Sequence, residues 1–190
     1  MTESPIEILV GIGSELIPDA GIAEARATGS NDPLLWRSYV RAVFALIEGL
    51  NYARLHMAKE PVHVPAEAAE RAREAARLEK KNAKADHARE VVVSTRVSFA
   101  AHAAAYQVQN PLTPSGSDWS EFLAAVAVRD RITHPKSKAD CQVSDVDCAL
   151  IRRVHHWYQQ LDVRLMEASR PRKGGGVEQG YLDSSVKGKT

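Results

Sequence analysis

Residues 119–135 read WSEFLAAVAVRDRITHP, and this stretch decides how the rest of the chain is interpreted. Phe122, Val126 and the basic residues within 129–131 recur at roughly helical spacing, which predicts an α-helix. The helix should end near His134, because the residue before a proline is pushed out of the helical region. An apolar helix therefore delivers basic side chains and a histidine to one end.

Arg129, Asp130 and His134 are the candidate catalytic residues at that end. Asp130 and His134 are four residues apart on one helix face, so the carboxylate can hydrogen-bond an imidazole nitrogen and fix which nitrogen carries the proton. The long side chain of Arg129 can reach a phosphate that His134 also touches. Together these are the parts needed for acid/base chemistry at a phosphodiester. The alternative is structural, since basic residues in the last turn of a helix interact favourably with its dipole.

The run Arg129-Asp130-x-x-x-His134-Pro135 resembles the signature of the HEPN superfamily, which is arginine, a polar residue, three more residues and then histidine. The wider runs 128–136, 143–145 and 36–48 resemble an uncharacterised bacterial group of HEPN-like proteins, and the resemblance covers about residues 31–168. It implies an antiparallel helical bundle that is usually dimeric, with the two motifs facing each other across the dimer interface.

Many members of that superfamily are metal-independent RNases. The resemblance therefore implies an endoribonuclease in which His134 handles a proton, Arg129 stabilises charge on the phosphate and Asp130 orients His134, with no metal or other cofactor. It also implies a homodimer, RNA as substrate and an antitoxin or regulatory protein as a possible partner, in a toxin or phage-defence role. Lys136 stands where toxins paired with small nucleotidyltransferases carry a modified tyrosine, so that regulation is not expected. The alternative is a non-catalytic module for dimerisation or for binding nucleotides or partners.

The composition places the chain among ordinary globular proteins. It has 190 residues and a formal net charge of +1, so any RNA site must be a local patch. The two cysteines do not indicate a disulfide framework, and a zinc site built from Cys141, Cys148, His155 and His156 matches no usual ligand spacing. No run is long enough to span a membrane, and the acidic start does not resemble a signal peptide, so a cytoplasmic protein is expected.

Three parts are predicted along the chain: an N-terminal extension over residues 1–30, the helical domain over 31–168 and a flexible tail over 169–190. The extension contains an apolar run that can form a helix, which Pro18 should end. It is expected to pack on the domain or on a second subunit. The tail begins with basic residues and continues with glycines and polar residues.

Helix starts can be read at several positions of the domain. Residues 32–33 combine an N-cap aspartate with a proline at the first helical position. Ser117 or Asp118 can cap the motif helix, with Glu121 placed to complete a capping box. Ser144 can cap the last helix. Together with the apolar spacing between these starts, the signals predict an all-α fold.

Two segments between these helices need interpretation. Residues 66–89 are rich in alanine and charged residues, which predicts a solvated helix that leaves the core. The three valines at 91–93 could begin a strand, but the alanine-rich continuation favours a helix. His102 on this helix is interpreted as a core or interface histidine.

Glu48 lies on a mostly apolar helix and has two interpretations. The favoured one is an acid at the edge of the core, paired with an arginine such as Arg41 or Arg96. The other is a group that positions Arg129 for its work on a phosphate.

Overall fold

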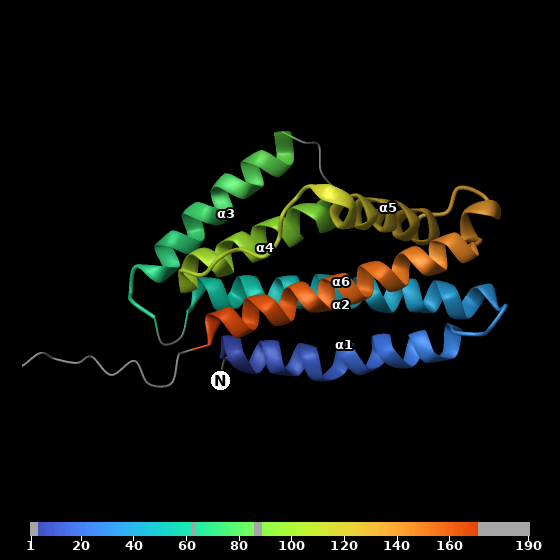
Figure 1. Cartoon of the computed structure of the whole chain (residues 1–190), viewed down its shortest axis with the longest axis horizontal. Helices are drawn as coiled ribbons and strands as arrows, with labels where there is room; N and C mark the ends of the chain where they lie inside the picture. Colours follow the sequence, from blue (N-terminus) through green and yellow to red (C-terminus); the bar gives the residue numbers. More distant parts are fainter. Residues whose placement is uncertain (1–3, 62–63, 86–88, 171–190) are drawn as a thin grey trace, which may run out of the picture.

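The computed structural model describes residues 4–61, 64–85 and 89–170. Within these ranges the chain forms α-helices and one short 3-10 helix without any β-strand, which confirms the all-α expectation (Figure 1). The elements are α1 (Pro5–Ala27), α2 (Pro33–Lys59), α3 (Ala68–Ala85), α4 (Glu90–Tyr106), α5 (Gly116–Thr133), η1 (Ala139–Cys141) and α6 (Asp145–Ser169). In the described ranges, no helix combines the length and apolar character that crossing a lipid bilayer requires.

The hydrophobic core lies between α2, α4, α5 and α6. Its most deeply buried aromatic residues come from all four helices, and they are Tyr39, Phe44, Phe99, Phe122 and Tyr158. The rings of Phe99 and Tyr158 meet edge to face with centroids 6.0 Å apart, a favoured arrangement for aromatic pairs. Because α5 contacts both α2 and α4, this core fixes where the end of the motif helix lies.

α1 is one continuous helix through Pro18, so the prediction that Pro18 ends a helix is wrong. A proline inside a helix removes one backbone hydrogen bond and costs stability. Packing of α1 along α2 offsets that cost, and the two helices lie side by side in Figure 1. The approach is close at Gly49, where an added Cβ would lie 2.6 Å from Leu16 Cδ1 and 3.0 Å from Ile12 Cγ2. The residues assigned to an N-terminal extension therefore form a helix that covers α2.

α3 is a helix, as predicted, and none of its residues belongs to the main hydrophobic core, but it is not fully solvated. It packs along α4, with Ala68, Ala72 and Ala83 buried. Small side chains allow this close packing, and Ala72 joins a second apolar cluster with Ala101 and Ala105 of α4 and Ala58 of α2. A segment that is mostly charged can thus pack against a neighbouring helix through its alanines.

Helix starts agree with the sequence at two of three positions. Asp32 Oδ1 accepts a hydrogen bond of 2.8 Å from the backbone N–H of Leu34, and Ser144 forms a capping box with Asp147. The capping box expected at Glu121 is wrong, because α5 begins at Gly116. Gly116 adopts a φ of 86°, which a glycine tolerates, and this lets the chain enter the helix earlier.

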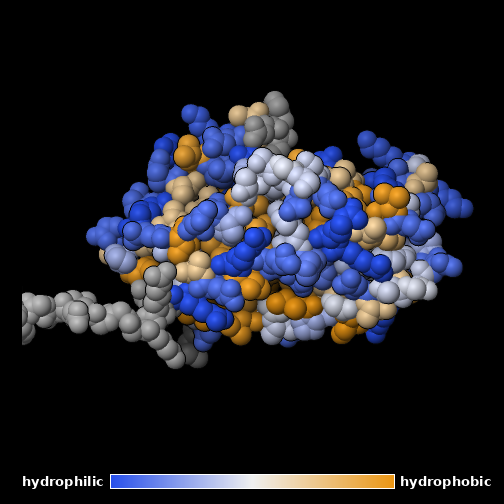
Figure 2. Space-filling model, viewed as in Figure 1, coloured by the Kyte–Doolittle hydropathy of each residue, from blue (hydrophilic) through white to orange (hydrophobic). Residues whose placement is uncertain are grey.

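The remaining elements follow the sequence closely. Residues 91–93 are helical, so the choice of helix over strand is confirmed. α6 ends at Ser169, at the start of the segment expected to be a flexible tail, and residues 171–190 of that segment lie outside the described residues. Figure 2 shows hydrophilic residues spread over the visible face, with hydrophobic patches between them.

Candidate functional site

The candidate site begins at the C-terminal end of α5. Phe122, Val126 and Ile132 are buried and anchor this helix in the core. Thr133 is its last residue and His134 follows in a non-helical conformation, so the predicted end before Pro135 is confirmed. The backbone N–H of His134 donates a hydrogen bond of 2.9 Å to the carbonyl oxygen of Asp130.

Arg129 is held between two carboxylates. Its Nη2 lies 2.8 Å from Glu48 Oε1 on α2, and its Nη1 lies 3.1 Å from Asp130 Oδ1. The other oxygen of Asp130 lies 3.3 Å from Nη1 of Arg89, the residue that precedes α4. Three helices therefore meet in a chain of alternating charges that runs Glu48, Arg129, Asp130, Arg89.

Glu48 does not have the partner that the sequence favoured. Its carboxylate contacts Arg129, so the expected pairing with Arg41 or Arg96 is wrong. Arg96 instead pairs with Glu79 of α3. The second interpretation requires this contact between Glu48 and Arg129, and the role that it adds, positioning Arg129 for a phosphate, stays a prediction.

The structure does not bring the Asp130 carboxylate to the His134 imidazole. Within the described ranges, the carboxylate is engaged by Arg129 and Arg89, and no side chain hydrogen-bonds the imidazole. His134 is exposed at the helix end. An exposed ring without a fixed partner can turn toward a bound substrate or a second subunit.

Arg129 and Asp130 line a cavity of about 540 Å³ between α2, α4 and α5, which we call the charged cavity. Its lining residues are Glu48, Asn51, Tyr52 and Leu55 of α2, Arg89, Glu90, Val91 and Ser94 at the start of α4, and Arg129 and Asp130 of α5. Among the described residues no side chain caps the N-terminus of α4 there, so its first-turn amides add positive potential to this wall.

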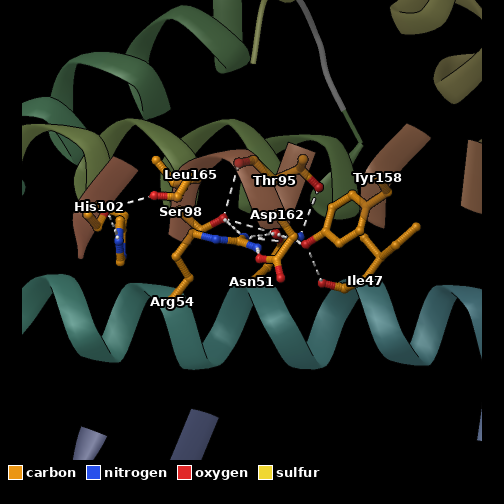
Figure 3. A network of polar contacts seen from close by, with 10 residues as sticks. Ile47, Asn51, Arg54, Thr95, Ser98, His102, Tyr158, Asp162 and Leu165 are labelled. Carbon is orange, nitrogen blue, oxygen red and sulfur yellow. Dashed lines mark hydrogen bonds and ion pairs between the residues drawn. The ribbon is translucent and has the colours of Figure 1, made fainter. Parts of the chain in front are cut away.

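The charged cavity has a rigid wall at Asn51 because that side chain belongs to a buried polar network (Figure 3). Asn51 Oδ1 accepts hydrogen bonds from Arg54 Nη1 at 3.0 Å and Tyr158 Oη at 2.8 Å, while Asn51 Nδ2 donates to Thr95 Oγ1 at 2.8 Å. Arg54 is fully buried, forms an ion pair with Asp162 and lies 4.0 Å from the centre of the Phe99 ring. The hydrogen bonds and the ion pair of this buried guanidinium fix the rotamers around it.

The buried histidines belong to other contacts. His102 donates or accepts a 3.0 Å hydrogen bond with Ser169 Oγ, and burial, together with the charge of Arg54, lowers its pKa to about 3. His102 is therefore a neutral core residue, as predicted. His155 contacts the Tyr39 hydroxyl at 3.1 Å, and burial lowers its pKa.

The cysteines and histidines considered for zinc do not converge. Burial raises the pKa of Cys148 to about 11, which keeps the thiol protonated. His155 is buried and His156 exposed, so the two rings point to different surroundings. Across the residues that the structure describes, no three His, Cys, Asp or Glu side chains are grouped to hold a metal ion.

Sequence reasoning missed Arg89, Tyr52, Asn51 and Ser94 as neighbours of the motif. Tyr52 could have been found, since it lies one turn after Glu48 on the same helix face. Arg89 could not, because it comes from the segment between α3 and α4 and no spacing relates it to α5. Comparisons with known proteins add no further residues: no family model, no curated protein and no solved structure matches the chain.

Proposed function

We propose that this protein is a metal-independent endoribonuclease whose site is the charged cavity together with His134. The observation that carries the proposal is the position of Arg129. Its guanidinium lines an open cavity beside a second arginine, Arg89, while His134 follows five residues later, exposed just past the end of the same helix. Two arginines that bind a phosphodiester and an imidazole that moves a proton at it are the groups that such a reaction needs.

The chemistry is an internal transfer that needs no activated water. The ribose 2′-oxygen attacks phosphorus, its proton leaves to an imidazole, and the bond to the 5′-oxygen breaks. Arg129 stabilises the negative charge that grows on the phosphate, an effect worth about 2.7–4 kcal/mol for one donor in other enzymes. The leaving oxygen takes a proton from a second acid, and the products carry 2′,3′-cyclic phosphate and 5′-hydroxyl ends.

A second copy of the chain would supply that second acid. Each chain carries one such motif, and the HEPN-type antiparallel bundle that the motif resembles is usually dimeric. We therefore propose a two-fold homodimer in which His134 and the partner subunit's His134 lie near the axis and act as base and acid. A toxin or defence role with an antitoxin partner follows from the same resemblance.

The test is incubation of the purified protein with total cellular RNA. The wild type should cut the RNA and leave cyclic phosphate ends, with or without EDTA, whereas His134→Ala should not. His156→Ala is the matched control, because His156 is also an exposed histidine but lies on α6 against Gln160. Intact RNA after incubation with wild type, or equal cutting by His134→Ala, would contradict the proposal.

A non-catalytic binding module is the second candidate. One observation favours it: the charged cavity holds three carboxylates against two arginines, and Arg129 is already neutralised. Intact RNA in that assay, together with binding of a nucleotide or RNA in a separate binding measurement, would support this candidate over the endonuclease.

A further inference from the structure

Tyr52 is an exposed aromatic residue inside the charged cavity. It lies in the middle of α2, one turn after Glu48, and 56% of its surface is accessible. Behind it along the helix, the ring of His56 lies with its centroid 4.8 Å from that of Tyr52, at an interplanar angle of 55°. The two rings form a small aromatic surface beside the arginines that line the cavity.

The stretch of α2 that carries this surface is held firmly. Its neighbour Asn51 is buried and fixed by hydrogen bonds to Arg54, Thr95 and Tyr158. A ring on such a backbone loses little conformational freedom when a ligand stacks on it. If Tyr52 served only a structural contact, its ring would not need to remain open to solvent at the cavity.

We propose that Tyr52, supported by His56, is a stacking surface for an unpaired nucleobase, and that the charged cavity therefore takes single-stranded RNA. The proposal rests on the proposed function and names the form of its substrate. Arg129 and Arg89 contact the phosphate next to the stacked base. Bases stack on aromatic side chains only when they are released from a duplex, and this combination of rings and arginines is characteristic of single-strand recognition.

The duplex form does not fit the same surface. Bases in an A-form helix are stacked on one another, and the helix offers its phosphates and 2′-hydroxyls to a protein. Duplex RNA could contact the arginines but would leave Tyr52 unused. The two forms therefore differ in how strongly they depend on the ring at position 52.

Fluorescence anisotropy with uncleaved RNA measures that dependence. The parent protein is His134→Ala, and the three probes are a labelled single strand, its duplex, and the same single strand with abasic sites at its central positions. Tyr52→Ala should weaken binding of the single strand about 5- to 150-fold. It should leave binding of the duplex and of the abasic strand unchanged.

Two variants serve as controls. Tyr52→Phe keeps the ring and should bind the single strand within about twofold of the parent. Leu34→Ala removes another exposed apolar side chain of α2, 53% accessible and about 27 Å away along the helix, and should change nothing. Tyr52→Ala should keep the parent's circular dichroism spectrum, because the side chain is mostly exposed.

The outcomes separate this inference from the endonuclease. Equal binding of the single strand by Tyr52→Ala and parent, no binding by the parent, or an equal loss on duplex and abasic RNA would overturn the stacking surface, even if the wild type cuts RNA. Ring-dependent binding of the single strand would support it, even if the wild type cuts nothing and the endonuclease proposal fails.

Discussion

Two carboxylates already hold the guanidinium of Arg129, and a phosphate would have to compete with them. In the structure its guanidinium is neutralised by Glu48 and Asp130, at 2.8 and 3.1 Å. A phosphate that enters the charged cavity must share or replace one of these carboxylates. Glu48 is the more exposed of the two, with 45% of its side chain accessible against 33% for Asp130, so it is the one that a substrate displaces at lower cost.

Glu48→Gln should therefore separate binding from catalysis. Loss of the carboxylate removes repulsion toward the phosphate, so KM for RNA should fall about two- to fivefold, the range expected from an exposed ion pair. The kcat value should fall as well, because Arg129 loses the partner that sets its direction. Steady-state cleavage of a labelled RNA measures both.

Glu15→Gln is the control for Glu48→Gln, since it removes an exposed carboxylate from α1 and should leave both constants unchanged. If Glu48 had a purely structural role, Glu48→Gln would lower the melting temperature but would not lower KM together with kcat. A rise in KM for Glu48→Gln would contradict the competition between Glu48 and phosphate.

At the scale of elements, α3 shows that charged residues can help a helix to pack against its neighbour. Its alanines lie against α4, and two of its charged residues make contacts that solvent-exposed residues would not. Arg71 donates hydrogen bonds of 3.3 Å to the carbonyl oxygens of Ala104 and Ala105 in the last turn of α4. Glu79 forms an ion pair with Arg96, and their side chains are 21% and 10% accessible.

Substitutions of two acidic residues of α3, Glu79 and Glu70, should consequently differ in their cost to the free energy of unfolding. Glu79→Gln removes the charge of one partner of a nearly buried guanidinium and should lower the free energy of unfolding by about 1.5–3 kcal/mol. Glu70→Gln is the matched control, because Glu70 pairs with Arg73 on the surface with 72% of its side chain accessible. It should cost less than about 0.5 kcal/mol. Urea denaturation measures both, and equal costs would show that the Glu79 pair contributes no more than a surface pair.

The elements show what the sequence could and could not predict. Local signals were sufficient for the start of α2 at Asp32, the start of α6 at Ser144 and the end of α5 before Pro135, because each depends on neighbouring residues only. The helix through Pro18 depends on packing against α2, which no local rule contains. The partner of Glu48 and the place of Arg89 depend on how three helices meet, and helical spacing cannot relate residues on different helices.

At the scale of the whole molecule, the proposed RNA binding would have to come from local charge. The net charge is +1, so long-range attraction of a polyanion is weak. A single chain also presents only one His134, whose ring is exposed and hydrogen-bonds to none of the described side chains. The proposed function accommodates both facts if two copies of the chain combine their sites.

A homodimer with the two His134 residues near a two-fold axis is therefore expected. Light scattering at micromolar concentration should give the mass of two chains, twice 20.8 kDa. In a Cys141→Ser background, His134→Cys should form an intersubunit disulfide on mild oxidation, because equivalent residues near the axis approach each other. Cys148 is buried and needs no replacement. His156→Cys in the same background is the control and should stay monomeric on a non-reducing gel. A monomer that still cleaves RNA would contradict the shared site, since one imidazole would then have to accept the 2′-hydroxyl proton and return it to the leaving oxygen.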